Sequence, residues 1–158
     1  MMARAKRLAA RSVVIALAAA AMCVPSASGA QRGPLRVAIG EVGSSGGPDA
    51  ARALTRAIAE ALEQQPAIDV APARRAQLVV RGSISRWEQR AVSGGLEVRC
   101  EVSLVVTEAR GGSIRAMLRG RGGARGGGDA ARLSSDALRA AVRGALRPLA
   151  TQGPALAR

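Results

Sequence analysis

The sequence has no histidine, tyrosine or phenylalanine, and it has a single tryptophan, Trp87, and a single lysine, Lys6. The absence of histidine excludes a Ser-His-Asp or Cys-His catalytic arrangement and any histidine metal site. The scarcity of aromatic residues means that Leu, Val, Ile and Ala must build the core. We therefore expect a protein that is not an enzyme and has no catalytic residues, no metal, no cofactor and no small-molecule substrate.

Residues 1–30 have the organisation of a secretory signal peptide. Basic residues up to Arg11 precede a short apolar run, Val13–Ala21, and small residues follow as far as Ala30. The run is shorter than the roughly 20 residues that a membrane-spanning helix needs. We predict cleavage near Ala30 and a periplasmic or secreted protein, with an uncleaved anchor as the alternative.

Cysteine occurs at two positions, Cys23 and Cys100. Lipid attachment at Cys23 is the less favoured interpretation, because Met22 stands where lipoprotein signals carry a small residue. Loss of residues 1–30 leaves Cys100 alone, so the mature chain has no internal disulfide. Cys100 lies on the apolar face of a predicted strand and is interpreted as a small buried hydrophobe, with a reactive or intermolecular thiol as the alternative.

Acidic residues are few, and the whole chain has 24 basic residues, 11 acidic residues and a net charge of +13. Four basic residues and no acid lie in residues 1–30, so the remainder has 20 basic and 11 acidic residues, a net charge of +9. Such a charge favours anionic partners, among them lipopolysaccharide, wall polymers and nucleic acid. A genome that favours arginine codons is the competing explanation.

Alternation of apolar and polar residues predicts five strands. The clearest is Leu96–Glu108, with six apolar residues on one face and mostly polar residues on the other. The other predicted strands are Leu35–Val42, Ile68–Ala71, Gln77–Glu88 and Ser113–Arg121. Prolines bracket Ile68–Ala71, so we place this strand at an edge of the sheet.

Apolar residues at helical spacing predict two helices, Asp49–Gln65 and a second from Asp129 to about Ala150. Residues 120–128 are predicted to be a flexible loop, and residues 151–158 a flexible tail. The expected fold is a single α/β domain over residues 31–150. It is a two-layer sandwich in which both helices cover one face of a mixed sheet of about five strands, in the order β-α-β-β-β-β-α.

One strand and its neighbour carry a family resemblance. The segment Ala76–Ser85, AQLVVRGSIS, is similar to the A-D-x-V-V-x-G-S-I strand of a bacterial envelope superfamily. That superfamily includes the TolB amino-terminal domain, LpoB and CsgG. The matching residues are Ala76, Val79, Val80, Gly82, Ser83 and Ile84, with Gly112 and Ile114 in the following segment. The resemblance implies an accessory domain of the cell envelope that binds other proteins and catalyses nothing.

The sheet face opposite the helices is the predicted partner-binding surface. Trp, Met and Arg are enriched at protein interfaces. The candidate partner-binding residues are Arg81, Trp87, Arg99, Arg115, Met117 and Arg119. Alternatives are a solvated face, or one covered by the tail or by a second copy of the chain. On the same face, Glu97 and Glu101 lie roughly 13 Å apart, which favours a cross-strand salt-bridge ladder over a catalytic pair.

Two functional classes fit these observations. The first is an exported protein-binding or assembly accessory domain with an envelope protein as its partner. The second is a basic protein that binds anionic envelope polymers, lipid or nucleic acid through its arginines. The tract RGRGGARGGG (residues 119–128) lacks the interleaved aromatic residues that stack on bases, so we expect no specific nucleic-acid recognition from it. The two classes differ in salt dependence, because added salt weakens binding to a polyanion far more than an apolar contact.

Overall fold

The computed structural model describes residues 33–44 and 46–156. All of them belong to one compact unit, Gln31–Arg158. The predicted signal peptide and Cys23 lie outside the described residues.

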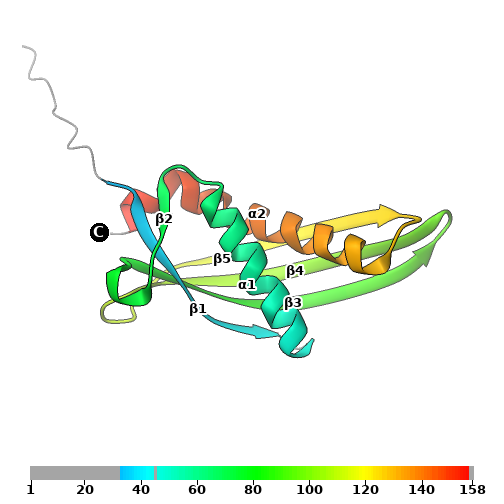
Figure 1. The fold of residues 1–158 in the computed structure, drawn as a ribbon, viewed down its shortest axis with the longest axis horizontal. Helices are drawn as coiled ribbons and strands as arrows, with labels where there is room; N and C mark the ends of the chain where they lie inside the picture. Colours follow the sequence, from blue (N-terminus) through cyan, green and yellow to red (C-terminus); the bar gives the residue numbers. More distant parts are fainter. Residues whose placement is uncertain (1–32, 45, 157–158) are drawn as a thin grey trace, which may run out of the picture. The chain divides into compact units, whose positions relative to one another are not determined.

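The sheet has five strands in the spatial order β2-β1-β3-β4-β5 (Figure 1). The strands are β1 (Leu35–Ser44), β2 (Ile68–Val70), β3 (Leu78–Val92), β4 (Gly95–Glu108) and β5 (Ile114–Gly126). The strand β1 is parallel to β2 and β3, whereas β4 is antiparallel to both its neighbours. The helices are α1 (Gly47–Glu63) and α2 (Ala130–Leu156), and a short 3-10 helix, η1, spans Ala73–Arg75. The predicted fold class, element order and edge position of β2 are confirmed.

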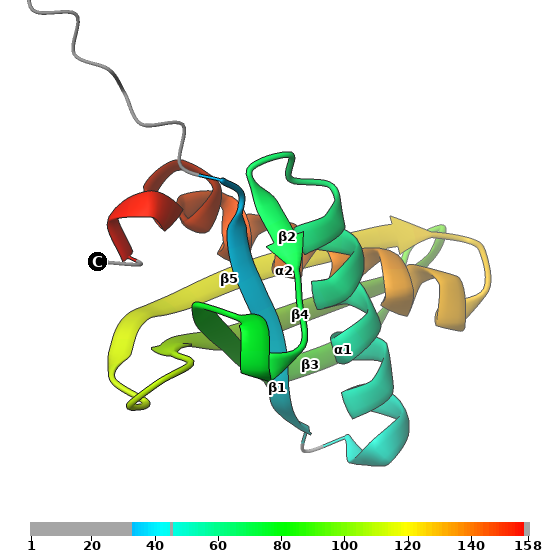
Figure 2. The same ribbon diagram turned by 60° about the vertical axis from the view of Figure 1, so that its left-hand side comes forward.

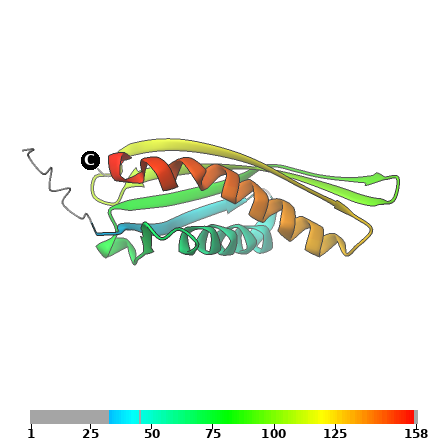
Figure 3. The same ribbon diagram turned by 90° about the horizontal axis from the view of Figure 1, so that it is seen from above.

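Both helices cover the same face of the sheet, which we call the inner face (Figure 3). The alternating residues of β4 from Val98 to Val106 are buried there, against apolar residues of both helices such as Ile58 and Leu146. The sheet twists strongly, and β1 runs at a steep angle to β4 and β5 (Figure 2). No described helix or strand covers the opposite face, which we call the outer face.

The glycine-rich segment 120–128 is not the flexible loop that the sequence predicts, because β5 continues through most of it. The backbone of α2 passes directly over these glycines. A Cβ atom on Gly120 would lie 2.0 Å from the carbonyl oxygen of Ala141, and one on Gly122 would lie 2.1 Å from the carbonyl oxygen of Ala137. Glycine is required here because no side chain fits between strand and helix.

The predicted tail is helical as far as Leu156. The apolar stripe of α2 continues past Leu149, because Leu156 lies seven residues further on and packs against the core. Two helical turns separate these residues, so both contact the same side of the domain. The burial of Leu156 therefore extends the helix beyond the predicted end near Ala150.

Candidate functional site

A β-bulge places Trp87 on the inner face, which contradicts the prediction that it lies on the outer face. Between Ile84 and Arg86 the pairing of β3 with β4 slips by one residue and leaves Ser85 without an opposite partner. A slip of one residue exchanges the two faces of a strand, so Trp87 stands opposite the buried Cys100. The apolar pattern of the flanking residues does not mark a single extra residue in a strand, so the sequence did not predict this bulge.

Trp87 lies in a groove between the two helices. The groove has a volume of about 390 Å³ and is lined by residues of α1 and α2, among them Ala53 and Leu138. Trp87 as a whole residue is 38% exposed. An ion pair between Glu60 of α1 and Arg139 of α2, at 3.2 Å, crosses the rim. The groove is therefore a feature of the helical layer, separate from the predicted partner-binding face.

The structure brings three of the predicted partner-binding residues together on the outer face. Arg81 of β3 is opposite Val105 of β4, which in turn is opposite Met117 of β5, so these side chains form one row. Arg119 lies in the next outer row, opposite Ser103. Both arginines are exposed.

An apolar patch lies around Met117. A second register slip, in the pairing of β4 with β5, puts Ile114 opposite Thr107 on the outer face, so the prediction that Ile114 points inward is wrong. Ile114 is 64% exposed and Met117 is 65% exposed, whereas their neighbours Val79 and Val105 are half-buried. We call Val79, Val105, Ile114 and Met117 the Met117 patch.

Arg99 and Arg115 do not lie within this patch. Arg99 is six residues along β4 from Val105, a separation of roughly 20 Å, and its guanidinium is 2.9 Å from Glu97. Arg115 is the extra residue of the slip in β5, and its side chain forms an ion pair with Glu108. The six predicted residues are thus divided between one cluster and three separate positions.

One cross-strand pair of the expected salt-bridge ladder is present on the outer face, between β4 and β5, whereas Glu97 pairs with Arg99 of its own strand. Arg121 lies 3.0 Å from Glu101 across the two strands. Both side chains are in contact with water, so the pair adds at most about 1 kcal/mol to stability. This part of the face has the character of a solvated surface.

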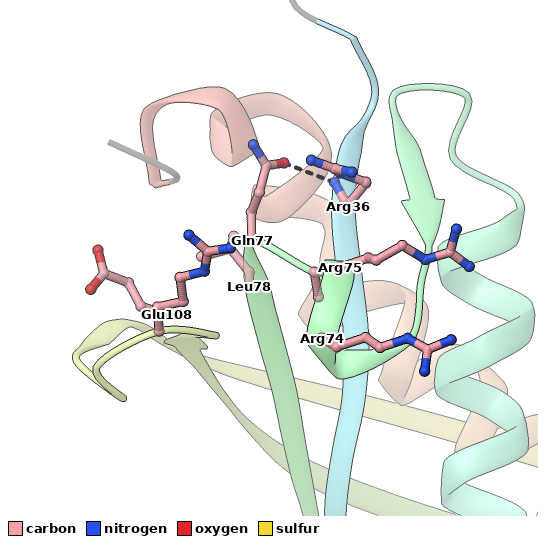
Figure 4. Close-up of a pocket in the computed structure, with 8 residues that line it drawn as sticks. Arg36, Arg74, Arg75, Gln77, Leu78 and Glu108 are labelled. Atoms are coloured by element: carbon pink, nitrogen blue, oxygen red, sulfur yellow. Dashed lines mark hydrogen bonds between the residues drawn. The ribbon is translucent and has the colours of Figure 1, made fainter.

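Four arginines line a second concave surface that the sequence analysis did not identify (Figure 4). We call it the arginine pocket. Its volume is about 450 Å³, and its lining residues are Arg36, Arg74, Arg75, Ala76, Gln77, Leu78, Glu108 and Arg110. The arginines come from β1, from η1 and from the turn between β4 and β5. Separate segments far apart in sequence form the pocket, so no local motif could have indicated it.

Cys100 is the one free cysteine of the described residues, and it is buried. Burial raises the pKa of the Cys100 thiol to about 11, and the charge of Glu101 adds to the shift. A thiol with this pKa remains protonated and unreactive near neutral pH. No group of three or more Cys, Asp or Glu side chains in residues 33–44 and 46–156 is arranged to hold a metal ion. No helix in the same part of the chain has the length and apolar character to cross a membrane.

Comparison with solved structures identifies the fold. PelC from Paraburkholderia phytofirmans, described as a dodecamer, superimposes with a TM-score of 0.55 at 17% identity, over 74% of this chain and 93% of PelC. A DUF330 protein from Xanthomonas campestris gives a TM-score of 0.56 at 8% identity, over 77% of this chain and 88% of its own. A hypothetical protein from Chlamydia trachomatis gives a TM-score of 0.52 at 11% identity, over 78% of this chain and 98% of its own.

These neighbours correct the predicted family. The solved structures that resemble the chain are PelC and DUF330 folds, and not the TolB, LpoB or CsgG domains that the strand AQLVVRGSIS suggested. The matching residues are valine, isoleucine, glycine and serine of one alternating strand, which report strand formation and do not identify a family. No protein-family model matches the sequence, and a search of curated proteins finds no match. Because the sequence identities are low, the comparison shows that the chain shares the fold of PelC and the DUF330 protein and shows nothing beyond the fold.

Proposed function

We propose that this chain is an exported, non-catalytic assembly domain of the cell envelope that associates with further copies of itself through the Met117 patch. The main support for this proposal is the exposure of Met117 and Ile114, at 65% and 64%, on a sheet face that no described element covers. Large apolar side chains exposed together on one surface favour a protein contact. Arg81 and Arg119 border the patch and supply the polar rim that such contacts have.

One observation on a protein of the same fold supports self-association, and the predicted signal peptide supports the envelope location. PelC, which has the same fold, forms a dodecamer. The predicted signal peptide directs the chain to the envelope, where an assembly domain of this kind would act.

The test measures the oligomeric state of protein purified from cells that express the full chain. We expect native mass spectrometry and light scattering to show an assembly larger than a monomer. Met117→Ser removes the most exposed large apolar side chain and should weaken association about tenfold or more, because one buried Met contributes roughly 1.5–3 kcal/mol. Val70→Ser is the matched control, since Val70 is also an exposed apolar strand residue, at 36%, but lies at the opposite edge of the sheet.

The salt dependence provides a second readout. An apolar contact should persist as salt is raised, whereas association through arginines should weaken. A protein that remains monomeric at every accessible concentration would contradict the proposal. Equal loss of association in Met117→Ser and Val70→Ser would also contradict it, because the contact would then not be located at the patch.

A further inference from the structure

The arginine pocket concentrates positive charge without matching acid. Within residues 33–44 and 46–156, no carboxylate lies within ion-pair distance of Arg36, Arg74, Arg75 or Arg110. The one acid in the lining, Glu108, is already paired with Arg115. All four arginines are exposed, so water and salt weaken their mutual repulsion, but four like charges around one cavity still favour an anion that enters.

Strand pairing brings one further acid, Asp69, near the pocket. It stands beside Arg36, where β2 pairs with β1. Asp69 is exposed and does not line the pocket. One such carboxylate leaves the four guanidinium groups with a large excess of positive charge.

Gln77 holds the separate segments of the pocket together. Its backbone N–H donates to the carbonyl of Arg36 at 2.8 Å, and its side-chain Oε1 accepts from the backbone N–H of Arg36 at 3.0 Å (Figure 4). The backbone N–H of Ala109, in the β4–β5 turn, donates to the carbonyl of Gln77 at 2.9 Å. One residue therefore fixes both β1 and the turn that carries Arg110 beside η1.

The form of the pocket indicates what kind of anion it would bind. Figure 4 shows the side chains of Arg74 and Arg75 leaving η1 in one direction, away from Glu108. The guanidinium of Arg36 lies apart from those of Arg74 and Arg75 in the same view, so the charges do not meet at one point. Such a spread fits a chain with several acidic groups better than a single small ion, because each guanidinium can form its own two-pronged contact with a carboxylate or phosphate.

We propose that the arginine pocket binds an anionic polysaccharide through its acidic groups. No aromatic residue lines the pocket, so the base stacking that supports binding of single-stranded nucleic acid is not available there. The proposed export of the chain would bring the pocket to the compartment that contains such polymers. This inference is independent of self-association through the Met117 patch, because the pocket is complete within one chain.

The experiment measures binding of polygalacturonate, a polymer of carboxylate sugars, to protein purified from cells that express the full chain. The test variant is Arg74→Gln with Arg75→Gln. The matched control is Arg143→Gln with Arg147→Gln, which removes two exposed arginines of α2 and changes the net charge equally. We expect the pocket variant to raise the Kd about tenfold and the control to change it less than about twofold, since screening makes distant charges weak.

A third variant separates local charge from global charge. Gln77→Glu keeps an acceptor for the backbone N–H of Arg36 and all the main-chain hydrogen bonds, but it places a carboxylate among the arginines. We expect the Kd for polygalacturonate to rise several-fold while the melting temperature is unchanged or higher.

Three results would overturn the proposal. The first is an equal loss of binding in the two double variants, which would show nonspecific attraction to a basic protein. The second is unchanged binding in Gln77→Glu. The third is binding of a single-stranded oligonucleotide that equals that of polygalacturonate and has the same sensitivity to the Arg74 and Arg75 substitutions.

Discussion

The contact between α2 and the glycine-rich half of β5 makes Gly120→Ala a decisive substitution. The added Cβ would lie 2.0 Å from the carbonyl oxygen of Ala141 and 2.7 Å from the backbone nitrogen of Ala145. These are backbone atoms, so no change of side-chain rotamer can relieve the clash. The helix must move away by an ångström or more, and the core below it must open.

We expect a large loss of stability. Overpacking a core costs typically 1–3 kcal/mol, and a clash with backbone belongs at the upper end, about 3 kcal/mol. For a domain of this size that corresponds to a fall in Tm of about 10 °C. Thermal and urea unfolding, followed by circular dichroism, would measure both quantities.

Gly123→Ala is the matched control on the same strand. Its Cβ would point to the outer face, with the nearest atom, the carbonyl oxygen of Val98, at an ordinary 3.6 Å. Loss of a glycine there should be neutral or slightly stabilising, because the unfolded chain loses conformational freedom. If Gly120→Ala proves as stable as Gly123→Ala, this segment does not contact α2 and our account of the helix layer is wrong.

Two further predictions concern the inner face. The pKa of Cys100 is raised to about 11 from an ordinary 9.0, so a thiol reagent at pH 8 should label Cys100 in the unfolded chain and leave Cys100 of the native protein unlabelled, as peptide mapping of the labelled site would show. The same shift stabilises the fold below about pH 9, and that contribution should be lost as pH rises from about 9 to 11. Rapid native labelling at pH 8 would refute the burial of this thiol. Trp87, as the only tryptophan, should show emission that shifts to longer wavelength on unfolding, because the groove covers much of the indole. Native emission identical to that of the unfolded chain would place Trp87 in open solvent.

Much of the fold follows from periodicity in the sequence. Six apolar residues at alternate positions place one whole face of β4 in the core. Each of α1 and α2 has one apolar stripe, and that side of the helix must be buried against the sheet. These patterns are local, and burial of an entire face is worth many times the contribution of any single residue. Fold class and element order were therefore predictable.

The candidate sites depended on details that carry little local energy. One extra residue at Ser85 moved Trp87 from the predicted interface to the helix groove, and another slip brought Ile114 onto the outer face. No composition rule marks such positions, because a bulge is selected by the strands on either side. Of the six predicted partner-binding residues, only Arg81, Met117 and Arg119 therefore lie together on the outer face, and their role in binding stays a prediction.

By itself, the sequence determined the order of strands and helices and the apolar face of each, and it excluded histidine-based chemistry. Only the tertiary structure decided the role of the glycines at 120 and 122. The sequence predicts a flexible loop there, whereas in the fold these glycines allow the backbone of α2 to pack directly against β5. It also decided the meeting of Arg36, Arg74, Arg75 and Arg110, whose segments approach each other through hydrogen bonds of Gln77. The physical reason is the same in both cases. Alternation and helical spacing are set by neighbours along the chain, whereas close backbone contact and charge clustering are set by neighbours in space.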